Sequence, residues 1–133
     1  MSTATATMTT QQVANRLVEL CRTGNFEGAV NELYHNDIES DEPAGAGPGP
    51  QHVKGIEAVR AKTIEWGKNV EEMHSASVSD PVVAGNHFAI AMKVDVTMKG
   101  MGRINMDEVA VYEVTDGKIT RDQFFYPAMP SQN

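Results

Sequence analysis

The stretch FAIAMKVDVTM at residues 88–98 decides the fold because its residues alternate in character. Every even-numbered residue from Phe88 to Met98 is apolar, whereas the odd-numbered positions include Lys93 and Asp95. Successive side chains of a β-strand point to opposite faces of its sheet, so this period of two predicts a long strand. One face of this strand is expected to be buried and the other exposed.

Shorter patterns of the same kind predict that this strand belongs to an antiparallel sheet. Further strands are expected at residues 73–78, 104–114 and 119–126. Glycines near residue 100 and the pair Asp116–Gly117 mark the turns that join the later strands. The second half of the chain is therefore expected to be a meander of antiparallel strands.

The first half of the chain shows helical spacing instead. Thr9 and Gln12 have the spacing of a capping box, and apolar residues then recur every three or four positions. Asn25 is placed to cap a second helix, and a third is expected to begin near Gly55. Helices followed by an antiparallel sheet define an α+β fold, in which the helices close one end of the sheet and leave a pocket.

Length and charge limit the organisation of the protein and its partners. The 133 residues suffice for one domain, which we expect at 11–127, between a flexible segment at 1–10 and a tail at 128–133. The net charge of −7 disfavours nucleic acids and anionic membrane surfaces as partners. No apolar run approaches the roughly 18 residues of a membrane span.

Cysteine content gives a further expectation about location. The lone Cys21 cannot form a disulfide within the chain, so nothing indicates an oxidising compartment. Cys21 also falls on the apolar stripe of the first helix, where it is expected to fill the core. We therefore expect a cytoplasmic protein.

Several longer motifs resemble those of a known family. They are LYHNDIESDEP at 33–43, GIEAVRAK at 55–62, VAVYEVTDGKI at 109–119 and RDQFFYP at 121–127. In their order and spacing they resemble the SnoaL-like branch of the nuclear transport factor 2-like superfamily, which includes ketosteroid isomerases, limonene epoxide hydrolases and polyketide cyclases. The resemblance implies a cone-shaped barrel, with three N-terminal helices packed on a strongly curved antiparallel sheet that encloses a pocket.

The resemblance also implies a homodimer through the outer face of the sheet. The residues available on that face are Ala89, Ala91, Val109, Val111 and Phe125.

Residue by residue, the chain nearly matches one functional position of these enzymes and lacks the others. Asp41 lies near the position of the isomerases' general base, although one residue is inserted before Pro43. The two positions whose side chains donate hydrogen bonds to the oxyanion in the isomerases fall on Leu17 and Ala110, whose side chains cannot donate a hydrogen bond. The Arg-x-Asp dyad of the epoxide hydrolases falls on Glu108-x-Ala110. The resemblance therefore implies neither a steroid-type isomerase nor an epoxide hydrolase.

Strand parity points to a different set of ionisable residues. Glu108 is a carboxylate on an otherwise apolar strand face. His74 and Asp122 lie two positions from apolar residues on their own strands, so each is expected to share a strand face with them. If these faces are concave, the three side chains share one cavity; a β-bulge would exchange Glu108 for Asp107. The expected walls of the cavity are Tyr34, Trp66, Met92, Tyr112, Phe124 and Tyr126.

A histidine beside a carboxylate in an apolar pocket is a plausible acid/base unit, since histidine titrates near neutrality. The alternative is that His74 and a carboxylate only satisfy each other's hydrogen bonds. Asp41 is likewise either a proton carrier or a solvated turn residue. The sequence has no metal-ligand spacing and no nucleotide-binding motif, so neither a metal nor a cofactor is expected.

Two classes of function remain open. The first is a pocket for an apolar, carbonyl-bearing small molecule, in which a cofactor-free isomerase, cyclase or hydrolase would act by proton transfer. The second is a non-catalytic module for ligand binding or dimerisation. A regulatory domain would in addition need an exposed apolar patch beyond the dimer face.

Overall fold

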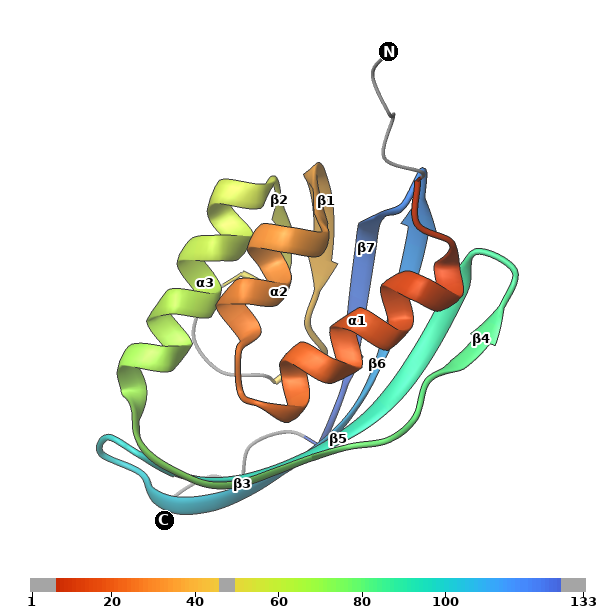
Figure 1. The fold of residues 1–133 in the computed structure, drawn as a ribbon. Coiled ribbons are helices and arrows are strands. Elements are labelled where there is room, and N and C mark those ends of the chain that lie inside the picture. Colours follow the sequence, from red (N-terminus) through yellow and green to blue (C-terminus); the bar gives the residue numbers. More distant parts are fainter. Residues whose placement is uncertain (1–6, 46–49, 128–133) are drawn as a thin grey trace.

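The computed structural model describes residues 7–45 and 50–127. It contains three helices, α1 (Thr10–Arg22), α2 (Phe26–Leu33) and α3 (Ile56–Asn69). The helices lie together on one face of a sheet (Figure 1). The α+β class expected from the sequence is therefore confirmed. The expected tail at 128–133 and most of the expected N-terminal segment lie outside the described residues.

The helices begin where the sequence places their caps. Thr9 Oγ1 accepts a hydrogen bond from the backbone N–H of Gln12 at 3.1 Å, and the Gln12 side chain accepts one from Thr9 N at 2.9 Å. Asn25 Oδ1 accepts one from Gly28 N at 2.9 Å. The residue before α3 is Gly55, whose φ of 95° favours glycine.

The sheet has seven strands within the described residues. They are β1 (Tyr34–Asp41), β2 (His52–Lys54), β3 (Val70–Val78), β4 (Val82–Ala84), β5 (His87–Met98), β6 (Gly102–Thr115) and β7 (Lys118–Phe125). The strand order is β2-β1-β7-β6-β5-β3, and β4 pairs with β5 beside this path. The strand order ends at β2 and β3, so it describes an open sheet with two edges.

The sheet is mixed, which corrects the expected antiparallel arrangement. β1 runs parallel to β7, with Ser40 opposite Asp122, while the other pairs of strands are antiparallel. The physical reason is the distance between β1 and β7 in the chain, since only strands joined by a short hairpin must run antiparallel. This parallel pair brings two strands from opposite ends of the chain to the same part of the core.

The core lies between the helices and the even-numbered face of β5. All six even-numbered residues of β5 from Phe88 to Met98 are buried, as the alternation predicts. On β6 the same face carries Ala110, Tyr112 and Val114, which are also buried. Burial of these apolar side chains drives the helices onto this face of the sheet.

Candidate functional site

A cavity of about 210 Å³ lies between the three helices and the inner face of the sheet. Its helical walls come from α1, α2 and α3, and its floor comes from β5, β6 and β7. The apolar and aromatic residues expected from the sequence all line it: Tyr34, Trp66, Met92, Tyr112, Phe124 and Tyr126. Ligand sites in proteins are commonly concave and mostly apolar in this way.

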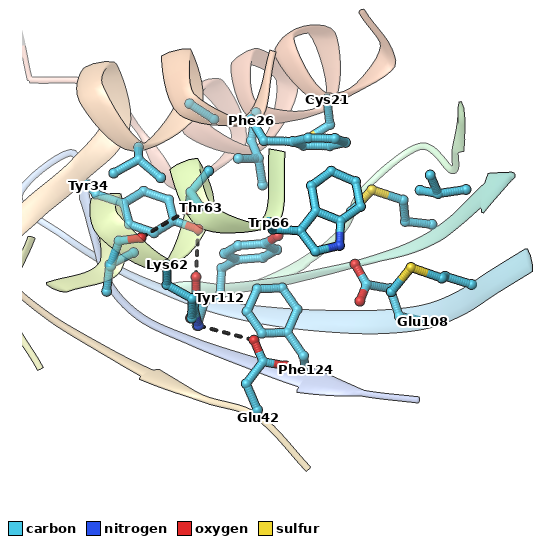
Figure 2. A pocket seen from close by; sticks show the side chains of 18 of the residues that line it. Cys21, Phe26, Tyr34, Glu42, Lys62, Thr63, Trp66, Glu108, Tyr112 and Phe124 are labelled. Atoms are coloured by element: carbon cyan, nitrogen blue, oxygen red, sulfur yellow. Dashed lines mark hydrogen bonds and ion pairs between the residues drawn. The ribbon is translucent and has the colours of Figure 1, made fainter. Parts of the chain in front are cut away.

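Aromatic rings form much of the cavity wall. Trp66 meets Phe26 edge to face at 5.6 Å between ring centroids, and Tyr112 meets Phe124 edge to face at 6.5 Å. In the view of Figure 2 the Trp66 indole lies between the rings of Phe26 and Phe124. Aromatic pairs at these distances and angles are favourable and give the wall a defined shape.

Glu108 is the carboxyl group of β6 that lines this apolar cavity. It pairs across the sheet with Met92, and its side chain is only partly exposed. The pKa of Glu108 is raised from 4.5 to about 7, mainly by burial and also by the nearby carboxylates of Glu42 and Asp122, while Lys62 opposes the shift. Near neutral pH this carboxyl group can therefore both accept and donate a proton.

Asp122 is buried at another part of the cavity wall, with 1% of its surface exposed. Tyr34 Oη donates a hydrogen bond to Asp122 Oδ2 at 2.5 Å. Asp122 Oδ1 has no hydrogen-bond partner among the described residues. Burial raises the pKa of Asp122, although the hydroxyl groups of Ser40 and Tyr34 lower it, so the neutral acid is favoured relative to an exposed aspartate.

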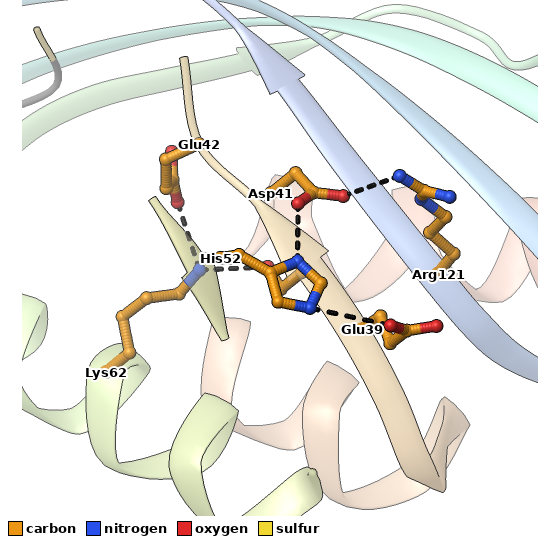
Figure 3. A network of polar contacts seen from close by, with 7 residues as sticks. Glu39, Asp41, Glu42, His52, Lys62 and Arg121 are labelled. Atoms are coloured by element: carbon orange, nitrogen blue, oxygen red, sulfur yellow. Dashed lines mark hydrogen bonds and ion pairs between the residues drawn. The ribbon is translucent and has the colours of Figure 1, made fainter. Parts of the chain in front are cut away.

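A charged pair at the edge of the cavity was not predicted from the sequence. Lys62 Nζ lies 3.0 Å from Glu42 Oε1 and donates to Ser40 Oγ at 2.9 Å. Tyr126 Oη donates to Glu42 Oε2 at 2.6 Å. The contact between Lys62 and Glu42 is visible in Figures 2 and 3.

Signals for this pair were present in the sequence. Lys62 stands three residues after Val59 and four before Trp66, so it shares the inner stripe of α3. Glu42 shares parity with the buried residues Ile38 and Ser40.

The structure corrects the placement of His74. The register of β3 against β5 shifts between Met73 and Ser75, and this bulge turns His74 away from the helices. His74 is exposed, with Nε2 2.7 Å from Thr97 Oγ1 and Nδ1 3.1 Å from a carboxylate oxygen of Glu72. The expectation that His74 shares a cavity with Glu108 and Asp122 is therefore wrong, whereas Glu108 and Asp122 do line the same cavity.

Asp41 does not line the cavity either. Its Oδ1 lies 2.6 Å from His52 Nδ1, and its Oδ2 accepts from Arg121 Nη2 at 2.9 Å (Figure 3). Hydrogen bonds from His52 and Arg121 and their charges lower the pKa of Asp41. A carboxylate held ionised in this way is poorly suited to carry protons, so the geometry favours a structural role.

Cys21 lines the cavity from α1, and burial raises the pKa of its thiol to about 12. It is therefore a neutral thiol, which fits the expected role as core filler. Among the residues that the structure describes, no three His, Cys, Asp or Glu side chains come together as metal ligands. None of the described helices is long and apolar enough to cross a membrane.

Comparison with known proteins gives a related crystal structure and other structures that share the fold. The crystal structure of a "putative SnoaL-like polyketide cyclase" from Mesorhizobium loti is 40% identical, covers 90% of this chain and all 100% of its own, and has a TM-score of 0.81. An NTF2-like protein from Burkholderia pseudomallei is 16% identical, with a TM-score of 0.73 over 91% of this chain and 93% of its own.

A protein with a ketosteroid isomerase-like fold from Catenulispora acidiphila is 17% identical, with a TM-score of 0.68 over 89% of this chain and 87% of its own. A search of curated proteins gave no match.

These likenesses place the fold in the nuclear transport factor 2-like class, also called ketosteroid isomerase-like. The SnoaL-like domain family matches residues 8–126, which is nearly the whole described chain. This protein belongs to the SnoaL-like domain family. The resemblance seen in the sequence motifs is therefore confirmed.

Proposed function

We propose that the protein binds an apolar carbonyl compound in the cavity and moves a proton on it without a cofactor. The observation that carries the proposal is Glu108, a carboxyl group set among apolar and aromatic walls with its pKa raised to about 7. Such a pKa suits a general acid or base at neutral pH. The name of the Mesorhizobium loti relative, "putative SnoaL-like polyketide cyclase", supports a carbonyl-bearing substrate.

The proposed step starts with Glu108 as a carboxylate. It removes a proton from the carbon next to the substrate carbonyl. The electron pair of that C–H bond forms a C=C bond, and the π electron pair of the C=O bond moves to the carbonyl oxygen, which gives an enolate. The enolate then takes the proton back from Glu108 at the same or a conjugated carbon, or attacks a second carbonyl carbon, whose oxygen takes the proton from Glu108. The first outcome is exchange or isomerisation, and the second is ring closure.

Asp122 is placed to assist this step. Its Oδ2 already accepts the proton of Tyr34, so a neutral Asp122 carries its own proton on Oδ1. That proton can be donated to the carbonyl oxygen of a ligand, where negative charge develops. This role would also give Asp122 Oδ1 the partner that it lacks among the described residues.

The test is hydrogen exchange at carbon next to the carbonyl of a simple apolar ketone. The protein is incubated with butanone or cyclohexanone in D₂O, and loss of the α-proton signals is followed by NMR. We expect the wild type to speed exchange, with a rate that rises as the pH passes about 7 and Glu108 ionises. Glu108→Gln should lower the rate at least about 100-fold, since general bases contribute about 10²–10⁴-fold.

Asp122→Asn is the second variant, and binding is measured in parallel by fluorescence of Trp66, the chain's single tryptophan. The substitution keeps the shape of the side chain but removes the acidic proton, so exchange should slow while binding persists. Ketone binding without exchange in the wild type would refute the enzymatic proposal and support the non-catalytic binding module. If neither binding nor exchange is seen, the ligand class is wrong.

A further inference from the structure

A second hollow of about 480 Å³ lies where the start of α2, the end of α3 and the start of β3 meet. Five of its eleven lining residues are apolar and half-buried: Phe26, Ile64, Trp66, Val70 and Met73. Apolar side chains gathered at the surface in this way commonly mark a binding site. We call this feature the outer hollow.

The outer hollow lies against the cavity described above. Phe26, Thr63 and Trp66 line both, so these three side chains form the wall between them. Phe26 and Trp66 meet edge to face at 5.6 Å, and both are partly exposed. This wall is therefore made of side chains, which can move aside by rotation about their own bonds.

We propose that the cavity and the outer hollow form one elongated ligand site, with the Phe26–Trp66 pair between its two parts. Its ligand is a carbonyl compound whose polar end lies in the cavity near Glu108 and Asp122 and whose unbranched apolar tail lies in the outer hollow. The inference rests on the proposed function, because that function places the carbonyl group in the cavity.

Two observations favour an apolar tail over other occupants. The cavity of about 210 Å³ is only modestly larger than the roughly 150 Å³ cavities that hold benzene, so a longer ligand must extend beyond it. The two charged residues that line the outer hollow have opposite signs, Glu27 on α2 and Lys68 on α3, so the hollow favours neither an acidic nor a basic occupant.

The first experiment compares straight-chain methyl ketones of increasing length, from butanone to undecanone. The affinity of each ketone for the wild type is measured by calorimetry and by the fluorescence of Trp66, which lines both parts of the proposed site. Each methylene that becomes buried should tighten binding by about fourfold, and the gain should continue through the longest ketones. A plateau at the short ketones would overturn the elongated site.

Gly67 offers a variant that blocks only the outer hollow. It lines the outer hollow from α3, and a Cβ added there meets no atom within 4 Å. Gly67→Gln therefore adds a side chain at the wall of the outer hollow, starting from a Cβ that has room, and glutamine favours a helix over glycine. Butanone should bind this variant as it binds the wild type, while undecanone should bind at least about tenfold more weakly.

Ala61→Gln is the matched control, since Ala61 is exposed on the same helix and lines neither the cavity nor the outer hollow. It should leave the whole series unchanged. If Gly67→Gln and Ala61→Gln give the same profile, the elongated site is refuted even though the proposed function stands. If butanone binds none of the proteins, the proposed function itself fails.

Discussion

At the scale of single residues, the four ionisable side chains predicted to carry protons fall into two groups according to their surroundings. Glu108 and Asp122 lie in the cavity wall, where burial raises the pKa of each. Asp41 and His74 lie outside it, in polar contacts with exposed or partly exposed neighbours. Residue type alone did not separate these groups, because a pKa depends on burial and on neighbouring charges.

The raised pKa of Glu108 predicts how stability changes with pH. The folded state holds the Glu108 proton up to about pH 7, whereas the unfolded chain releases it near 4.5. Between these values the folded state binds more protons, so the free energy of unfolding falls as the pH rises. The loss for this group is at most about 3 kcal/mol and is complete above its folded pKa.

Urea unfolding of the wild type and Glu108→Gln at about pH 5 and about pH 8 measures this effect. The wild type should lose more stability than the variant over this range, because glutamine does not titrate. Titrating groups that do not interact with Glu108 contribute equally to both proteins and cancel in the comparison. Equal losses would show that Glu108 titrates in the folded protein as it does in solution.

At the scale of elements, strand parity is reliable only where a strand is regular. β5 pairs with β6 without a register shift from His87 to Met98, and its even-numbered residues are buried as the alternation predicts. β3 contains two register shifts, and His74 lies within the second one, between Met73 and Ser75, where it points away from the core. A bulge inserts one residue, which reverses the faces of all residues beyond it.

The bulge leads to a prediction for His74→Gln. Its contacts with Glu72 and Thr97 lie on the exposed side of the sheet, so removing them should change stability by less than about 1 kcal/mol. Ketone binding and exchange should match the wild type, in contrast with Glu108→Gln. A loss of exchange in His74→Gln with normal stability would mean that this histidine reaches the substrate.

At the scale of the whole molecule, the outer face of the sheet carries an apolar patch. Val109 and Phe125 are 45% and 48% exposed and lie opposite each other on β6 and β7. Ala91 of β5 lies opposite Val109. Val82 of β4 is 74% exposed and lies opposite Ala89 of β5. We propose that a second copy of the chain covers this patch, as the family resemblance implies.

Light scattering of the purified protein tests the proposed dimer. The wild type should have twice the mass of one chain, and Val109→Asp should have the mass of one chain, because a charge in a closed apolar interface lacks a partner. Met101→Asp is the control, since Met101 is also exposed but lies in the turn between β5 and β6. A monomeric wild type, or a dimeric Val109→Asp, would rule out this interface.

The sequence by itself determined the helices, their caps, the long strands, the family and the aromatic walls of the cavity. These follow from short-range periodicity and local hydrogen bonding, which a few neighbouring residues specify. Only the tertiary structure decided that β1 runs parallel to β7, that Lys62 and Glu42 meet at the cavity edge, and that His74 lies outside it. Each of these depends on contacts between residues far apart in the chain or on a single inserted residue, and local patterns specify neither.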